Sequence, residues 1–359
     1  MSRLSTFVPS NVNRRVNDVA AKTTNVKSFV RYAASFILTA LFLYLAFRDK
    51  DFNAVWNTLS KVRWWWVVIL LAGGYLSHLV RAWRWQYLLV PLKDSVTLRN
   101  SFSAVMIGYM VNNFLPRVGE VVRPYTLGKS ESISKTAAFG TVIIERIIDI
   151  IAFFTLLFVV TGFYSESFVE LFPSLASKEW LFLGGSVALF GFFVLFFFKA
   201  DAILSSLKKG IVFLPDTLRR KFEKLFDSFL TGFAVAKHPG QFMMIIVTSC
   251  LIQILYLLLM YIPFYAFDPI ASHSLNLGSA ALLLVVSTVA FALPTPSGFG
   301  TYHSFTTFAL TQLYHIDGVT ALSYSILTHE VGVMLTLVVG LFYFFKDHIR
   351  VREMVDDAG

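Results

Sequence analysis

The chain has 359 residues, of which 56% are hydrophobic and only 15% are charged. In soluble domains about a quarter of the residues are charged, so this composition excludes an ordinary soluble protein. The formal charge of +9 does not indicate nucleic-acid binding, because most basic residues flank long apolar runs. The single cysteine, Cys250, excludes a disulfide or a cysteine metal site within one chain.

The N-terminal arm, residues 1–27, is polar and basic and has no hydrophobic pattern, which predicts disorder. The apolar run after it is too long for the core of a signal peptide, so we interpret it as a retained span. We expect an all-α polytopic membrane protein with about six full spans of roughly 20 residues each. These spans are 28–47, 64–81, 136–163, 180–198, 241–263 and 319–345.

Two shorter apolar segments, 101–115 and 276–293, each end at a Leu-Pro pair that leads into glycine. Opposed broken elements in two halves are typical of an inverted repeat with a binding site near the membrane midplane. We therefore expect two re-entrant hairpins whose breaks form a flexible gate. Two ordinary spans, which would make eight, are the alternative. The residues of the breaks are Pro116, Gly119, Pro294, Pro296, Gly298 and Gly300.

The distribution of basic residues between the loops predicts which loops face the cytoplasm. Segment 199–240 carries eight basic and four acidic residues, whereas loop 164–179 carries one basic and three acidic residues. The excess of Lys and Arg on cytoplasmic loops then predicts that both termini, including the tail 347–359, are cytoplasmic. Loop 48–63 is an exception, because it would be external and yet is basic. The transmembrane domain covers 28–346.

An apolar stripe at helical spacing marks a further helix at about 216–236, with basic residues on its other faces. This pattern fits a helix in the cytoplasmic interface whose partners are anionic headgroups. Packing against the protein's own spans fits it equally well.

Glu145, Arg146 and Asp149 lie inside the apolar run 136–163. Insertion scales put each such charge at about 2.5–3.5 kcal/mol near a helix centre, so these groups need partners. Glu145 and Asp149 share a helix face, and Arg146 can reach Asp149. Three groups of the first break would complete a neutral set of six: Arg117, Glu120 and Arg123.

We interpret this set as the wall of a wet cavity in which arginines bind a phosphate. A planar guanidinium can bind two phosphate oxygens at once. Backbone N–H groups freed at the breaks would add donors, as helix ends do for anions. The alternative is an ion-pair staple between helices, although apolar packing would serve that purpose without desolvating charges.

Further polar groups lie along the predicted spans. Arg81 and Arg84 lie among aromatic residues at the end of a predicted span. This pattern favours an aromatic belt in which the arginine side chains extend to the membrane interface. The alternative is a rim that binds lipid headgroups. His329 and Glu330 lie in the last span, and His303 follows the second break. These three residues either take part in gating or proton coupling, or are only hydrogen-bonding residues inside the membrane.

The stretch G-Y-M-V-N-N-F-L-P-R-V-G-E-V-V-R, followed by V-I-I-E-R-I-I-D, resembles the lysylphosphatidylglycerol synthase transmembrane-region family, a flippase-like domain. R-A-W-R-W and L-P-T-P-S-G-F-G extend the resemblance over about 28–346. It implies about eight helical segments in an inner or plasma membrane, adds Asn113 to the site, and points to flipping of aminoacylated or glycosylated lipids. His303 departs from the pattern, which often has an acidic residue there.

We expect a stand-alone member without a transferase domain that binds and moves a phosphate-bearing lipid, either an aminoacylated phospholipid or a lipid-linked sugar. One alternative is an intramembrane enzyme with Glu145 or Asp149 as base and His329 as acid, but no metal-ligand spacing or nucleophile elbow supports it. Another is an accessory subunit for a separate transferase. We expect no catalytic residue, metal or cofactor.

Overall fold

The computed structural model describes residues 32–163 and 239–347, Val30, and isolated positions between 184 and 223. All regular structure in this part of the chain is helical, as the sequence predicts. The predicted arm, the interfacial helix, the span 180–198 and the tail after Asp347 lie outside the described residues or are described only at isolated positions.

Three of the described helical stretches are long and apolar enough to cross a membrane. Two are single helices, α3 (Trp64–Leu89) and α14 (Gly318–Lys346). The third is the continuous stretch Gly240–Ala266, in which α10 (Pro239–Tyr261) runs into the 3-10 turn η4 (Ile262–Ala266).

The first predicted span, 28–47, is described continuously from Tyr32 onward, and Val30 is also helical. Its described part, Tyr32–Phe47, is followed by α2 (Phe52–Ser60) at an angle of 80°, and only the two helices together are long enough to cross a membrane. The side chain of Asp51 caps α2 by accepting from the N–H of Asn53. Of about six predicted spans, the described residues therefore support three, or four if the bent pair is one span.

Two helices carry charges in their interior. Helix α6 (Lys135–Phe163) coincides with the predicted 136–163 and contains the three charges noted above. Helix α3 continues two turns beyond the predicted end at residue 81. The sequence prediction ended at the first charge, but Arg81 and Arg84 are buried inside the helix.

The first broken segment forms a helical hairpin. Helix α4 (Leu98–Asn112) ends shortly before Pro116, Arg117 adopts a left-handed backbone with φ of 66°, and α5 (Gly119–Glu131) runs back. The sequence predicted only a polar stretch where α5 lies. Its apolar residues pack on α4 and α6, a contact that no local pattern reveals.

Glycine lets the two arms of this hairpin touch. A Cβ atom on Gly119 would lie 1.9 Å from the carbonyl oxygen of Gly108, so only glycine fits there. The N–H of Gly119 donates to Oδ1 of Asn112 at 2.7 Å, which satisfies one of the free donors at the start of α5.

The second broken segment has the same form. Helix α12 (Leu277–Ala292) leads through the 3-10 turn η5 (Pro296–Gly298) into α13 (Thr301–Tyr314). Left-handed φ values of 49° at Ser297 and 79° at Gly300 turn the chain. A Cβ on Gly300 would lie 2.7 Å from a backbone oxygen of the helix Tyr32–Phe47, so this break packs closely against that helix.

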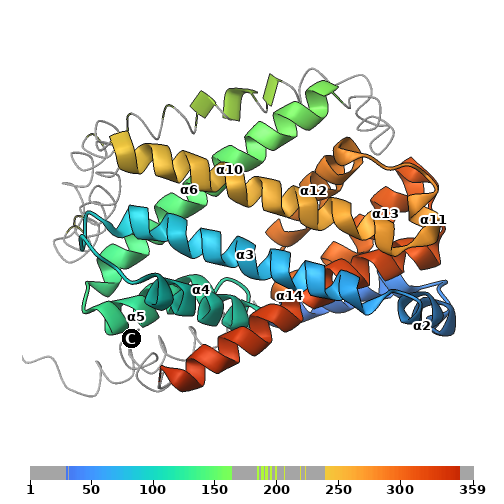
Figure 1. The fold of residues 1–359 in the computed structure, drawn as a ribbon, viewed down its shortest axis with the longest axis horizontal. Helices are drawn as coiled ribbons and strands as arrows, with labels where there is room; N and C mark the ends of the chain where they lie inside the picture. The colour runs from blue at the N-terminus through green and yellow to red at the C-terminus, as the bar shows by residue number, and fades with distance from the viewer. Residues whose placement is uncertain are drawn as a thin grey trace, which may run out of the picture.

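The two hairpins lie at opposite ends of the helical bundle (Figure 1). Figure 1 shows α3 and α10 side by side, with the α4–α5 hairpin at one end of the bundle and α12–α13, with the short α11 (Asp268–Ala271), at the other. Helix α14 packs against arms of both hairpins, α4 and α13. The two hairpins therefore enter the bundle from opposite ends.

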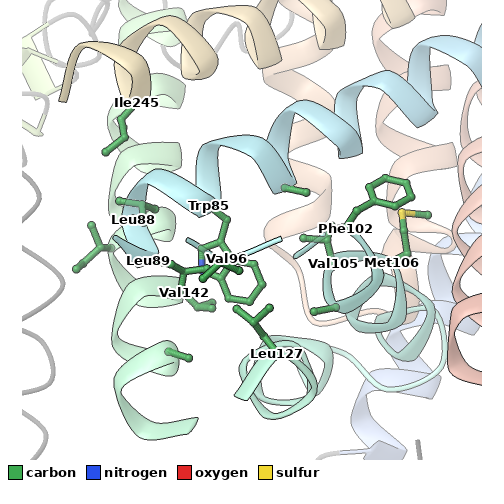
Figure 2. Close-up of a cluster of buried hydrophobic side chains, with 14 of the residues drawn as sticks. Trp85, Leu88, Leu89, Val96, Phe102, Val105, Met106, Leu127, Val142 and Ile245 are labelled. Carbon is green, nitrogen blue, oxygen red and sulfur yellow. The ribbon is translucent and has the colours of Figure 1, made fainter. Parts of the chain in front are cut away.

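A buried apolar core holds the first hairpin against α3 and α6. Figure 2 shows Trp85 of α3 between Leu127 of α5 and Val142 of α6, with Phe102 and Met106 of α4 nearby. Trp85 and Leu127 are fully buried. Between helices in a bilayer, such contacts stabilise through close van der Waals packing, because lipid tails are as apolar as these side chains.

Candidate functional site

Six charged side chains from three helices meet inside the bundle, and we call them the charged cluster. Helix α3 supplies two arginines, α5 supplies one, and α6 supplies one arginine and two carboxylates. They are Arg81, Arg84, Arg123, Glu145, Arg146 and Asp149.

Each carboxylate of the charged cluster faces several arginines. Oε1 of Glu145 lies 2.8 Å from Nη1 of Arg81 and 3.2 Å from Nη2 of Arg84. Asp149 lies 2.9 Å from Arg81 and 2.6 Å from Arg84. Arg146, on the same helix as the carboxylates, is 3.2 Å from Glu145 and 3.0 Å from Asp149. Arg81 and Arg84 are three residues apart and therefore share one face of α3, and Glu145 and Asp149 are four apart and share one face of α6. The ion pairs between these two faces join α3 to α6.

Arg123 brings the first hairpin into the charged cluster. Its Nη2 lies 2.8 Å from Oε2 of Glu145, within ion-pair distance, although the N–H does not point at that oxygen. Its guanidinium lies 3.8 Å from the ring centre of Trp85, a cation–π contact. The indole N–H of Trp85 donates to Thr141 at 2.9 Å, which fixes the ring under Arg123.

Helix α10 adds neutral partners that the sequence analysis missed. Nη2 of Arg81 donates to the hydroxyl of Tyr256 at 2.8 Å, and Nη1 of Arg84 donates to Ser249 at 3.1 Å. A signal was present, because Ser249, Gln253 and Tyr256 recur at three- and four-residue steps in an otherwise apolar span. Such a polar stripe must face protein or water.

Two positive charges of the charged cluster are unmatched, because four guanidinium groups face two carboxylates. The side chains of Arg84 and Glu145 are only 1% and 0% exposed, so water does little to offset this surplus. Five donor atoms of the charged cluster are also buried without an acceptor: the Nε atoms of Arg81, Arg84, Arg123 and Arg146, and Nη2 of Arg123. Buried donors without partners are costly.

The predicted neutral set is therefore wrong in two members. Arg117 is exposed at the tip of the first hairpin and donates to the carbonyl oxygen of Ala292 at 3.0 Å. Glu120 makes no ion pair with any described residue. Arg81 and Arg84 take the place of these two. Their interpretation as arginines at the interface is also wrong, because both are at least 96% buried.

A cavity of about 470 Å³ lies beside the charged cluster. Arg81, Arg146 and Asp149 form its charged wall, and Tyr256 lies on the same lining. The remaining lining is mainly apolar surface with polar side chains such as Ser77, Gln253 and Thr288 among it, and it comes from helices α3, α4, α6, α10, α12, α13 and α14. It includes Leu70, Phe153, Leu156, Leu259, Leu284 and Phe291. The cavity is thus amphipathic, with a charged region and an apolar region.

The tips of the two hairpins meet at this cavity. Asn113 of the first break and Ser297 of the second both line it, and the hydroxyl of Ser297 donates to Oδ1 of Asn113 at 2.9 Å. The amide of Asn113 also donates to Thr336 of α14 at 3.0 Å. Asn113 is thus a cavity residue, as expected, but it stands apart from the ion pairs of the charged cluster.

His303, His329 and Glu330 form a second polar group. Oε1 of Glu330 lies 3.3 Å from Nε2 of His303 and 2.9 Å from Nδ1 of His329. Nε2 of His329 lies 2.8 Å from the carbonyl oxygen of Ser297, and His329 also lines the cavity. The group therefore links the second break to α14.

The ligand atoms of this group lie within 4.8 Å of one another, close enough for one metal ion. The hydrogen bonds favour another arrangement. Nδ1 of His303 accepts from the N–H of Gly300 at 3.4 Å, so the proton of a neutral ring stays on Nε2, the atom that a metal would need. The geometry thus favours a hydrogen-bonded group over a metal centre.

Comparison with known proteins places the chain in a family. A family model described as Lysylphosphatidylglycerol synthase TM region matches residues 32–340. A UPF0104 membrane protein of Methanocaldococcus jannaschii is 38% identical over 109 residues, which cover 28% of this chain and 30% of that protein. Another UPF0104 membrane protein, from Methanothermobacter thermautotrophicus, is 36% identical over 73 residues, which cover 20% of this chain and 22% of that protein. No solved structure matches the chain.

Proposed function

Because the chain belongs to the lysylphosphatidylglycerol synthase TM region family and is a multi-pass membrane protein, we propose that it binds a phosphate-bearing lipid and moves the headgroup through the amphipathic cavity. The observation that carries this proposal is the surplus of two buried positive charges in the charged cluster, beside a cavity with an apolar lining. The lipid is of the kind that the resemblance implies, an aminoacylated phospholipid or a lipid-linked sugar.

The two regions of the cavity match the two parts of a lipid. Arg81 and Arg146 offer guanidinium groups, the side chains best suited to phosphate oxygens. The apolar lining offers an acyl chain a surface that water does not wet. Free anions would use only the first region, so the combination favours a lipid.

The hairpins supply the path in this proposal. Each enters the bundle from its own end, and their tips meet at Asn113 and Ser297, beside the cavity. We place both hairpins as re-entrant elements of an inverted repeat in a plasma membrane, with the termini in the cytoplasm and anionic lipids as partners. Left-handed backbone at Arg117 and Ser297 supports a gate, because such strained turns cluster at switch regions.

The ion pairs favour binding over catalysis. Glu145 and Asp149 each accept hydrogen bonds from two or more arginines. Arginines this close favour the ionised form of both carboxylates, and a carboxylate stabilised in this way is a poor general base.

Arg146→Ala tests the proposal, because Arg146 lines the cavity and is the most exposed arginine of the charged cluster. The variant should fold and reach the membrane but move fluorescent anionic lipid across liposomes on the order of tenfold more slowly, the loss expected for about 1.4 kcal/mol of binding. Arg63→Ala is the matched control, since Arg63 is exposed and outside the charged cluster. Wild-type transport by Arg146→Ala at equal protein content would refute the proposal.

A further inference from the structure

We infer that His329 and Glu330 share a bound proton, and that this proton holds the tips of the two hairpins together. The inference deepens the proposed function, on which it rests for the role of the hairpins as a gate, by naming the group that controls the gate. It is carried by the hydrogen bonds of the second polar group, which connect α14 to both breaks.

Both ring nitrogens of His329 face oxygen atoms. Nδ1 lies 2.9 Å from Oε1 of Glu330, and Nε2 lies 2.8 Å from the carbonyl oxygen of Ser297. A carbonyl oxygen only accepts hydrogen bonds, so the proton of a neutral ring belongs on Nε2. Nδ1 then has no proton to offer the carboxylate, because a neutral imidazole has one N–H. The contact between Nδ1 and Oε1 therefore needs one more proton, on either the ring or the carboxylate.

His303 does not supply this proton. Its Nδ1 accepts from the N–H of Gly300, so its neutral ring carries its own proton on Nε2, 3.3 Å from Oε1 of Glu330. The extra proton therefore belongs to His329 and Glu330, which together have no net charge when it is bound. It exchanges through the carboxylate, because the side chain of Glu330 is 36% exposed and those of both histidines are only 2% exposed.

The groups around the pair leave it as the site of titration. Two titratable side chains of α13 face His329, namely His303 and Tyr302, and the hydroxyl of Tyr302 contacts Thr328 at 2.9 Å. The charged cluster lies on the same cavity, but none of its six side chains forms an ion pair with His329 or Glu330. The other rings against the two histidines are apolar: Phe47, Phe291 and Phe299.

Loss of the proton breaks the bridge between α14 and the second break. The ring of His329 then has one N–H for two acceptors, so it loses its bond either to the carboxylate or to Ser297. Ser297 has a left-handed backbone with φ of 49°, a conformation that persists only where surrounding contacts hold it. Its hydroxyl donates to Asn113 of the first break at 2.9 Å. Release of the proton therefore frees the contact between the two tips.

The test measures the distance between the tips as a function of pH on the full-length protein. Spin labels are attached to Phe114→Cys and Ala292→Cys, which are exposed positions beside the two tips, after Cys250 is replaced by alanine. We expect a short distance at low pH and a longer one at high pH. The ratio of short to long populations should fall about tenfold per pH unit above the midpoint, because one proton is released. A distance that stays constant between about pH 5 and about pH 9 would overturn the inference.

Two variants identify the titrating pair. In Glu330→Gln the amide donates to Nδ1 of His329 at every pH, so the short distance should persist throughout. His329→Gln removes the ring and should abolish the response to pH. Asp94→Asn, which changes an exposed carboxylate in the linker before α4, is the control and should respond as the wild type does. A wild-type response in Glu330→Gln and His329→Gln would overturn the inference. So would one bound metal ion per chain that is lost in His329→Gln, because the metal would take the place of the proton.

Lipid transport in liposomes, with equal pH on both sides, separates this inference from the proposed function. The rate should depend on pH in the wild type and not in Glu330→Gln. Transport that is equally fast at every pH would overturn the inference and leave the proposed function intact. Tips that respond to pH in a protein that moves no lipid would support the proton site and refute the proposed function.

Discussion

Gly119 is the residue on which the first hairpin depends most directly. A Cβ there would lie 1.9 Å from the carbonyl oxygen of Gly108, far inside van der Waals contact with rigid backbone. Gly119→Ala should therefore force the arms apart and lower the free energy of unfolding by about 3 kcal/mol, the upper part of the range for overpacking. The thermal midpoint in detergent measures this loss.

Gly162→Ala is the control for that substitution. Gly162 is also in a helix, but a Cβ there would meet nothing within 4 Å. Alanine is the better helix former by roughly 0.5–1 kcal/mol, so the control should be neutral or slightly stabilising. If Gly119→Ala and Gly162→Ala change the thermal midpoint equally, α4 and α5 do not make the close contact described here.

At the residue scale, the sequence identified the charged carboxylates but misjudged their partners. Glu145, Arg146 and Asp149 stood out because charges are expensive in an apolar run. Arg81 and Arg84 looked like interface residues, since aromatic neighbours and basic side chains also mark a membrane boundary. Only the packing of α3 on α6 and α10 decides between these readings, and it is a long-range contact that a single helix pattern does not encode.

The base of the first hairpin is closed by Glu131, the last residue of α5. Its carboxylate accepts from Nζ of Lys93 at 2.5 Å, from the N–H of Thr97 at 3.0 Å and from Asn100 at 2.8 Å. Thr97 is also the N-cap of α4. One side chain therefore joins the end of α5 to the start of α4.

This contact makes stability depend on pH. Burial alone would raise the pKa of Glu131, but the hydrogen bonds from Lys93, Thr97 and Asn100 outweigh it and lower the pKa from 4.5 to about 2. The carboxylate thus stabilises the fold fully above pH 4.5, and this stabilisation is lost as the pH falls toward 2. Glu131→Gln should cost about 2 kcal/mol at neutral pH, the scale of hydrogen bonds to a charged group.

Thermal midpoints of wild type and Glu131→Gln across pH check this prediction. Their difference should be constant at neutral pH and shrink below pH 4.5, where the carboxyl of Glu131 takes up a proton in the unfolded chain but is still charged in the folded protein. Asp94→Asn removes an exposed carboxylate from the neighbouring linker and should leave the midpoint unchanged at neutral pH. A gap between wild type and Glu131→Gln that is as large at pH 3 as at neutral pH would contradict the assignment.

At the element scale, the sequence placed most described helices within a few residues, because long apolar runs are strong signals. It did not predict α2, α5 or α13 as helices, and α5 is polar on average and contains Pro124. Its helical form depends on neighbours that bury Val122, Arg123 and Leu127. It also drew α3 too short, since hydropathy falls at Arg81 while the helix continues.

At the scale of the whole molecule, the central question is whether the broken segments turn back. In the structure the chain leaves α4 and returns through α5, so the linkers before α4 and after α5 lie at one end of the bundle (Figure 1). The linkers around the α12–α13 hairpin lie at the other end. If α4 crossed the membrane as an ordinary span, the two linkers that flank α4 would instead face opposite sides.

Cysteine labelling in sealed vesicles distinguishes these layouts. Cys250, which is exposed, is first replaced by alanine, and single cysteines are then introduced at exposed linker or helix-end positions. Asp94→Cys and Thr136→Cys flank the first hairpin, and Ser272→Cys and Gln312→Cys flank the second. An impermeant thiol reagent should modify the first pair from one side only and the second pair only from the other. Labelling of Asp94→Cys and Thr136→Cys from opposite sides would mean that the first segment spans the membrane. The charged cluster would then lose the opposed, broken helices that bring it to a midplane cavity.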